Sequence, residues 1–353
     1  MDDDRMIRAF LVDDAPPSAE VVAEGRRRLY AAAPPARRPR RRPAWSLGAA
    51  GLAAAAACAA TVVTLGGGDP APPGGRTLTA SQVLLAAAHE AETAPPGRYW
   101  HSHVVAGQTY RVDQGGYAIV GARMEIDGWA ARSPRDADVT RSRFAGARPQ
   151  TAADRAAWAR AGSPKTWRVR SNGSLIVQRA ADQPWDVRRT SPAAKKAREA
   201  FFADQAERCA KTRDCPPSEP SAAQREAFAG DPKALRAYLD AATGQGGPSG
   251  MLRNAAGLLT QPGSGKLHGA VFRLLAGLPG IRNAGRTTDS EGRPALALSA
   301  RDARLDTRLL LEPGTYRVLG LQDVLVTGTE GLKPGTVYRQ DVYLKLGWTD
   351  EAP

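Results

Sequence analysis

The sequence predicts an α+β fold, in which one transmembrane helix precedes an exported domain where a curved antiparallel sheet cradles a group of helices. Three observations support this prediction. Residues 45–65 carry no charge, residues 98–179 and 295–346 break into short strand-like segments separated by turns, and residues 192–278 have helical periodicity. The chain has 353 residues, enough for two or three ordinary domains, so disorder throughout is not expected.

The charge balance is strongly basic, with a formal net charge of +13. Most of the 49 basic residues are arginine, in a chain that is also rich in alanine. We interpret this bias as the mark of a GC-rich genome rather than of a surface that binds nucleic acid. Nucleic acid is therefore not an expected partner. The membrane is an expected partner, because of the uncharged run at 45–65.

The uncharged run at 45–65 is the predicted transmembrane helix. A helix of 21 residues is about 30 Å long, which is enough to cross the hydrocarbon core of a bilayer. Five arginines lie at 37–42, just before the run, and no cation follows directly after it. The positive-inside rule then predicts a single-pass protein of the cell membrane with a cytoplasmic N-terminus and an extracytoplasmic C-terminal domain. A cleaved signal peptide and a lipoprotein processed at Cys58 are the rival interpretations.

Residues 1–43 form the predicted basic cytoplasmic tail. Apolar residues at helical spacing around Ile7 and around Val22, with a break at 13–17, predict two short amphipathic helices. Helices of this length are marginal in water without a partner. The tail is expected either to lie on anionic lipid or to dock a cytoplasmic protein. It contains no His and no Cys, which excludes a zinc-type anti-sigma module.

Residues 66–78 form a linker rich in Pro and Gly, and residues 79–350 form the extracytoplasmic α+β domain. Thr79 and Gln82 make a capping box that predicts the first helix of this domain. The Asn172–Gly173 pair predicts a hairpin with a type I′ turn. The first strands are expected at 98–112, 117–132, 166–170 and 174–179.

The middle and last parts of the domain differ in kind. Helical periodicity with Pro or Gly between segments predicts helices in the middle, and short apolar runs separated by turns predict strands afterwards. The helices are expected at 193–209, 221–228, 232–243, 250–259 and 267–278. The strands are expected at 295–300, 307–311, 316–321, 323–327 and 336–346.

Cys209 and Cys215 form the predicted disulfide. They lie close together in the sequence, on the oxidising side of the membrane if the domain is exported. Two free surface thiols are the alternative.

His101 and His103 are the candidate metal ligands. They alternate on a predicted strand, so both side chains point to one face. No third ligand is recognisable, and His89 and His268 belong to predicted helices elsewhere, so an ordinary strand face is the preferred interpretation and no metal is expected.

No catalytic set is apparent. The run at 263–267 resembles a phosphate-binding loop, but Leu267 occupies the position where Ser or Thr would hold magnesium. The run at 247–251 is not a nucleophile elbow, because Met251 replaces the second glycine. We therefore expect no cofactor and a protein that is not an enzyme.

The order of these features resembles a family of uncharacterised single-pass membrane proteins from actinobacteria. The resemblance rests on the segment at 6–10 before an acidic break, the arginine-rich stretch, the single anchor, the run at 96–100 and the strand at 316–320. Members of that family are often found beside sigma-factor genes. The resemblance implies an exported part similar to the open half-barrels of lipoprotein carriers and of sensors that restrain a sigma-factor pathway.

The expected function is a membrane-anchored binding protein. Its exported half-barrel would take an apolar or lipid-like ligand or another envelope protein, and its tail would report to a sigma factor or another cytoplasmic regulator. An enzyme of the cell wall or envelope and a passive structural protein of the envelope are the alternatives. Titratable groups converging on His101 and His103 would favour the enzyme.

Overall fold

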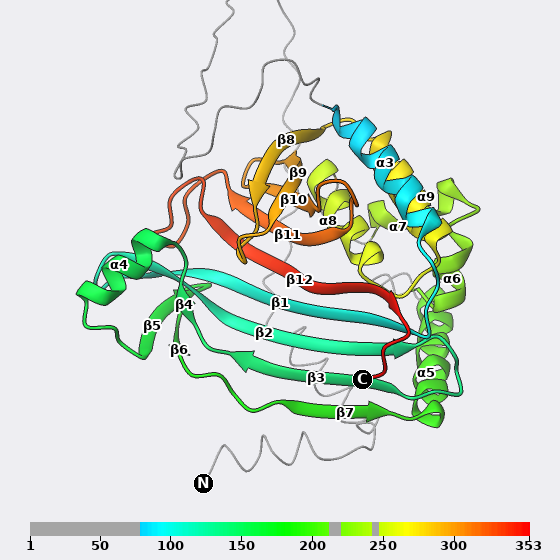
Figure 1. Ribbon diagram of the computed structural model, residues 1–353, viewed down its shortest axis with the longest axis horizontal. Helices are drawn as coiled ribbons and strands as arrows, with labels where there is room; N and C mark the ends of the chain where they lie inside the picture. The colour runs from blue at the N-terminus through cyan, green and yellow to red at the C-terminus, as the bar shows by residue number, and fades with distance from the viewer. Residues whose placement is uncertain (1–77, 212–219, 242–246) are drawn as a thin grey trace, which may run out of the picture. The chain divides into compact units, whose positions relative to one another are not determined.

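The computed structural model describes residues 78–211, 220–241 and 247–353 (Figure 1). Within these residues the chain forms a large open antiparallel sheet and seven helices, which confirms the predicted mixture of helices and antiparallel strands. The tail, the span at 45–65, the linker up to residue 77 and Cys215 lie outside the described residues. No helix in the described part of the chain has the length and apolar character needed to cross a membrane.

Ten strands form one sheet in which all pairings are antiparallel, in the order β7-β3-β2-β1-β12-β11-β10-β9-β8, with β4 beside β2. The sheet is open, because its outer strands β7 and β8 do not pair with each other. The strands in the first half of the chain are β1 (Tyr99–Val112), β2 (Tyr117–Ala131), β3 (Asp138–Ala145), β4 (Arg148–Pro149) and β7 (Asp186–Thr190). Those in the second half are β8 (Ile281–Thr288), β9 (Pro294–Arg301), β10 (Leu305–Leu311), β11 (Val318–Leu325) and β12 (Val337–Thr349).

A separate hairpin of β5 (Thr166–Ser171) and β6 (Ser174–Arg179) packs on one end of the β1–β2 pair. Its turn residues Asn172 and Gly173 have φ angles of 50° and 81°. Two consecutive positive φ angles are what a type I′ turn requires, so the predicted hairpin is confirmed.

Four of the helices pack on the β8–β11 half of the sheet (Figure 1). The predicted capping box at Thr79 and Gln82 is present and begins the first of them, because each side chain accepts a hydrogen bond from the backbone N–H of the other residue. Leu84, Leu252 and Leu275 are fully buried between the helices and the sheet. The helices are α3 (Ala80–Thr93), α4 (Ala152–Arg160), α5 (Pro192–Lys211), α6 (Ala222–Ala227), α7 (Pro232–Ala241), α8 (Pro248–Leu259) and α9 (Gly265–Ala276).

The strands alternate between two faces of the sheet. Leu309 and Leu311 join the core beneath the helices, whereas Leu310, between them, is buried in a small cluster on the opposite side. We call the first side the helix face and the second the ladder face. On β1, Trp100 lies on the helix face and His101 on the ladder face.

Several elements differ from the sequence predictions. The segments predicted as two strands at 316–321 and 323–327 are one continuous strand, β11, with no turn at Gln322. The strands β3, β4, β7 and β8 and the helix α4 were not predicted. The charged residues of β3 and β7 leave too few apolar side chains to show a period of two.

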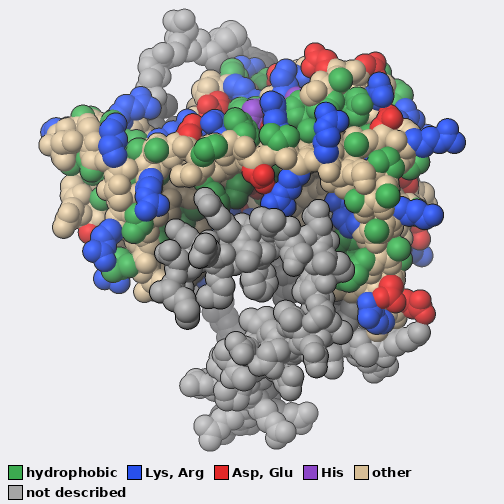
Figure 2. Space-filling view, turned by 90° about the horizontal axis from the view of Figure 1, so that it is seen from below, with side chains coloured by type: hydrophobic (Ala, Val, Ile, Leu, Met, Phe, Trp, Pro, Cys, Tyr) green, Lys and Arg blue, Asp and Glu red, His purple; other side chains and the backbone are tan. Residues whose placement is uncertain are grey.

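The basic side chains are dispersed on the face that Figure 2 shows. In the view of Figure 2, Lys and Arg side chains lie among hydrophobic and acidic ones and do not gather into one patch. This distribution agrees with the interpretation of the surplus as a compositional bias.

Candidate functional site

The sheet divides where β11 and β12 part. The two strands pair from Val324 opposite Val337 to Gly320 opposite Val342. Beyond Val342, β12 continues to Thr349 and pairs only with β1. Residues 343–349 therefore have no strand on their other side within the described part of the chain. We call this place the fork, and residues 343–349 its open edge.

Local sequence explains why the strands part at this point. Gly320 is the last residue of β11 paired with β12, and a Cβ atom there would lie 2.6 Å from the backbone oxygen of Asp341. The glycine thus allows an unusually close approach at the base of the fork. Just before β11, Tyr316 has a φ of 53° and donates its N–H to the Glu312 oxygen over 2.9 Å, which forms a tight turn. The turn carries the chain from β10 into β11, which begins at Val318 and pairs with β12 only from Gly320.

Arg293 closes the base of the fork. Its Nη1 atom donates to the Tyr343 backbone oxygen over 2.9 Å, and its Nη2 atom donates to the Leu319 backbone oxygen over 3.2 Å. One guanidinium therefore occupies carbonyl groups of both strands at the place where their pairing ends.

The position of Arg293 is set by Asp289 in the turn between β8 and β9. The Asp289 side chain is fully buried and accepts from Arg293 Nε over 2.6 Å. It also accepts from the backbone N–H groups of Glu291 and Arg293, each over 2.9 Å. A carboxylate with three donors fixes the turn and delivers the guanidinium into the fork.

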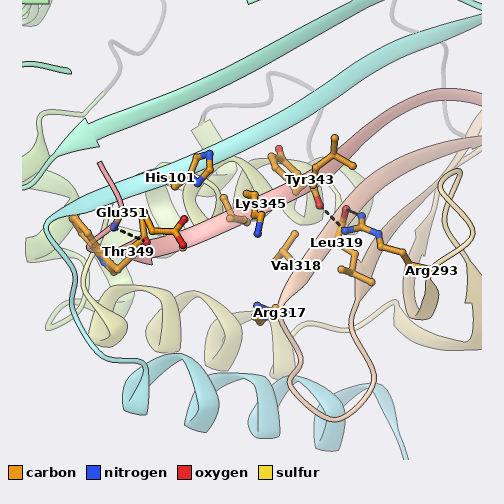
Figure 3. A pocket seen from close by; sticks show the side chains of 13 residues that line it. His101, Arg293, Arg317, Val318, Leu319, Tyr343, Lys345, Thr349 and Glu351 are labelled. Atoms are coloured by element: carbon orange, nitrogen blue, oxygen red, sulfur yellow. Dashed lines mark hydrogen bonds between the residues drawn. The ribbon is translucent and has the colours of Figure 1, made fainter. Parts of the chain in front are cut away.

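The open edge borders a pocket of about 330 Å³. Its charged side chains are three cations, Arg293, Arg317 and Lys345, and one acid, Glu351. Figure 3 shows Lys345 pointing from β12 into the space and Arg317 on the side of the space opposite β12. The remaining lining residues are His101, Val318, Leu319, Tyr343, Leu344, Leu346, Gly347, Trp348 and Thr349.

The helix face anchors the open edge through two tryptophans. Trp348 donates its Nε1–H to the Gly263 oxygen over 2.9 Å, and Trp100 donates to the Thr260 oxygen over 3.1 Å. Their rings meet edge to face at 5.5 Å. Tyr343 is also largely enclosed on this face, and burial raises the pKa of its hydroxyl to about 12. The edge is therefore tied to the segment between α8 and α9.

The ladder face anchors the same strands through two polar rungs. In the first, His101 Nε2 lies 2.8 Å from Asp127 Oδ1, and Arg141 donates to the other oxygen of that carboxylate. In the second, His103 Nε2 lies 2.9 Å from Glu125 Oε1.

Arg143 completes the second rung by donating from Nε to Glu125 Oε2 over 2.8 Å. Each rung thus runs His–carboxylate–Arg across β1, β2 and β3. We call the six residues the polar ladder, and it lies beside the open edge because His101 is opposite Gly347 and His103 is opposite Lys345.

Both carboxylates of the polar ladder are held ionised. Burial by itself would raise the pKa of Asp127, but hydrogen bonds from His101 and Arg141 outweigh burial and lower it. The same opposition, with His103 and Arg143 as donors, lowers the pKa of Glu125. Neither group is therefore prepared to give up a proton near neutral pH.

The prediction that His101 and His103 share one face is confirmed, but their partners are residues that sequence reasoning missed. Glu125 with Asp127, and Arg141 with Arg143, show the same alternation as the histidines. Three strands with polar pairs at i and i+2 were the signal that could have found them. In the described ranges no group of three or more His, Cys, Asp or Glu is placed to hold a metal.

The other residues considered from sequence have structural roles. His268 is buried beside the Gln261 oxygen at 3.2 Å, and burial lowers its pKa. Ser264 caps the N-terminus of α9, and Ser249 lies 2.8 Å from the Thr307 hydroxyl in the interior. The side chains of Cys209 and Cys215 are not described, so the disulfide stays a prediction.

Comparisons with known proteins include a distant structural neighbour. No protein-family model and no curated protein matches the chain. A solved structure of the Pseudomonas aeruginosa MucA/MucB complex is similar over 77% of this chain and 58% of that one, with 15% sequence identity and a TM-score of 0.25. The chain thus spans less than two thirds of the length of this neighbour. A similarity of this size transfers no residue role, and the site is interpreted from its own geometry.

Proposed function

We propose that this is a non-enzymatic, membrane-anchored binding protein whose exported domain recognises an extended segment of another protein by adding it as a strand to the open edge. The observation that carries the proposal is the unpaired side of β12 at residues 343–349. An extended peptide that joins a sheet edge makes backbone hydrogen bonds along its length, and side-chain pockets give it specificity.

The two outer edges of the sheet are less suited to this role. The strand β7 has only five residues, and its charged side chains include Asp186, Arg188 and Arg189. The strand β8 is interrupted by a bulge between Asn283 and Gly285. Short, charged and bulged edges resist pairing with other chains. The open edge also carries a register shift, at Leu344, but its seven residues exceed the five of β7, and it borders a pocket.

The length of the open edge fits a short peptide. A strand rises about 3.4 Å per residue, so residues 343–349 offer roughly 20 Å of backbone. The supports on both faces hold this backbone in place before any partner arrives. Such preorganisation lowers the entropic cost of binding.

The test uses peptides selected from a random display library against the full-length protein in detergent micelles. A photo-crosslinking amino acid at Leu344 should capture the selected peptides, and the same amino acid at Val187, on the outer edge β7, should not. N-methylation of alternate peptide amides should abolish binding in one of the two alternations only, because an added strand presents every second amide to the edge. Binding that survives both alternations, or capture at Val187 alone, would show that strand addition is wrong.

The anchored topology belongs to the same proposal. Residues 1–43 lie in the cytoplasm, residues 45–65 span the membrane, and the domain from residue 79 is extracytoplasmic. Protease added to intact cells should then degrade the domain while leaving the tail protected. A domain that resists the protease, or a mature N-terminus after Ala60, would refute this topology.

The tail is proposed to report to a sigma factor or another cytoplasmic regulator. Its two predicted amphipathic stripes need a partner to bury them. Co-purification of a sigma factor with the full-length chain, lost on deletion of residues 1–35, would support this part. A tail that retains no cytoplasmic protein counts against it.

A lipid-like ligand is a second candidate, favoured by one observation. On the helix face, Ile126 and Phe144 are 37% and 57% exposed, and neither belongs to the core that the helices form with the β8–β11 half of the sheet. Mass spectrometry of molecules that stay bound to the purified protein tests this candidate, and recovery of no lipid argues against it.

An enzyme is a third candidate, favoured by the titratable groups that gather around His101 and His103. Acid–base catalysis usually needs two groups whose environments separate their pKa values, one of them protonated. Both carboxylates of the polar ladder are instead held ionised by their ion pairs. Hydrolysis of cell-wall fragments that is lost in His101→Asn would favour the enzyme over the binding protein.

A further inference from the structure

We infer that the segment bound at the fork is acidic, with carboxylate side chains at alternate positions directed towards Lys345 and Arg317. This inference rests on the proposed strand addition and names the chemistry of the partner. It follows from the charges that three separate elements bring to one pocket.

The cations reach the pocket from different directions. Arg293 comes from the turn before β9, Arg317 from the turn before β11, and Lys345 from β12 itself. Arg293 and Arg317 are oriented by ion pairs with Asp289 and Glu312, whose carboxylates are not among the lining residues. The Arg293 guanidinium is thus fixed before a ligand binds, whereas Arg317 is held more loosely by an exposed ion pair.

Lys345 is the cation best placed to meet a ligand. It is exposed and points into the space between the strands (Figure 3). Within the described residues it forms no ion pair. A carboxylate on the neighbouring position of an added strand would be its cross-strand partner. The guanidinium of Arg317, 67% exposed, is available to a second carboxylate on the same side of the peptide.

A second copy of this chain is a poorer occupant. Two open edges paired about a twofold axis would bring the cations of one pocket against those of the other, and like charges across strands are destabilising. An independent acidic peptide meets no such repulsion. Glu351, at the far end of the pocket, disfavours an acid there and so places the carboxylates towards the base of the fork.

The size of the charge effect follows from exposure. An ion pair at an exposed site contributes up to about fivefold in affinity, and two such pairs contribute roughly tenfold. The effect should weaken as the salt concentration rises from about 0.05 M to about 0.5 M, because exposed charges are screened.

The experiment measures binding of three fluorescent seven-residue peptides to the full-length protein by polarisation. One peptide alternates valine and glutamate, one alternates valine and glutamine, and one alternates valine and lysine. We expect the glutamate peptide to bind roughly tenfold more tightly than the glutamine peptide and the lysine peptide to bind weakest. The double variant Lys345→Gln/Arg317→Gln should lose that advantage, and the matched control Lys333→Gln, an exposed cation in the loop before β12, should keep it.

The outcomes separate the acidic specificity from the strand addition. Equal binding of the glutamate and glutamine peptides, or no change in the double variant, overturns the acidic specificity. If one N-methylated alternation still abolishes binding in that case, strand addition stands without it. No measurable binding of the glutamate peptide, while library-selected peptides bind, also overturns the specificity. Insensitivity to both N-methylated alternations overturns the proposed function itself.

Discussion

Replacing Arg293 with alanine removes the group that joins the two arms of the fork. The variant loses the hydrogen bonds from the guanidinium to the backbone oxygens of Tyr343 and Leu319. It also leaves Asp289, whose side chain is fully buried, without its charged partner. Two backbone N–H groups still bind that carboxylate, so its charge keeps part of its compensation.

The expected cost is about 3 kcal/mol. Each hydrogen bond from a charged donor contributes about 1.5–3 kcal/mol in a buried setting. The Arg293 side chain is 30% exposed, so the lower end of that range applies to each of its two carbonyl contacts. Arg317→Ala is the matched control, because that side chain is 67% exposed and its pair with Glu312 is worth less than about 1 kcal/mol.

Two measurements test this prediction on the full-length chain. Denaturant unfolding followed by tryptophan fluorescence reports the free energy of unfolding. Hydrogen exchange of the amides at 343–349 and 318–320 reports local opening, which would show the effect if only the fork loosens. Arg293→Ala should destabilise more than Arg317→Ala in at least one of them. Equal unfolding and equal exchange in the two variants would refute the role given to Arg293.

Three further predictions concern the surrounding fold. In the folded protein the pKa values of Glu125 and Asp127 lie below their ordinary values of 4.5 and 3.8, so the stability they contribute is complete above those values and is lost as the pH falls through the folded pKa values. In the double variant Glu125→Gln/Asp127→Asn, the denaturant midpoint should therefore fall less steeply at acid pH. A midpoint that falls as steeply as in the wild type would contradict this. Leu84→Ala should cost about 2–5 kcal/mol and Leu85→Ala less than about 0.5 kcal/mol, because the first side chain is 0% and the second 51% exposed. The denaturant midpoints of the two variants measure this difference, and equal midpoints would contradict it. Gly320→Ala should cost about 1–3 kcal/mol, because the new Cβ would lie 2.6 Å from the Asp341 oxygen. If this variant unfolds at the same denaturant midpoint as the wild type, β11 and β12 can move apart at this position without cost.

Sequence patterns were informative where the local signal was strong. The capping box at Thr79 and the Asn172–Gly173 turn are decided by residues within four positions of each other, and both are confirmed. The helical faces around Leu235 and Leu252 were visible as periodic apolar residues, and both are buried. Local chemistry of this kind does not depend on which strands later become neighbours.

The fork was not predictable in the same way. It depends on the pairing of β12 with β1 across more than two hundred residues, and on the point where pairing with β11 stops. The sequence predicted one strand at 336–346, three residues shorter at its end than β12, with no sign that one side would lack a partner. Arg293 also appeared as one arginine among many, since its role requires Tyr343 and Leu319 to meet at the same place.

The polar ladder and the fork are linked by β1. This strand carries His101 and His103 towards β2 and β3, and its other side carries the whole pairing of the open edge. The ladder therefore braces β1 on one face, while Trp100 and Trp348 tie the two strands to the α8–α9 segment on the other. A strand edge braced on both faces is held in place without a neighbour, which lowers the cost of adding an incoming strand. In the proposed function, the six residues of the polar ladder therefore serve binding through rigidity rather than through proton transfer.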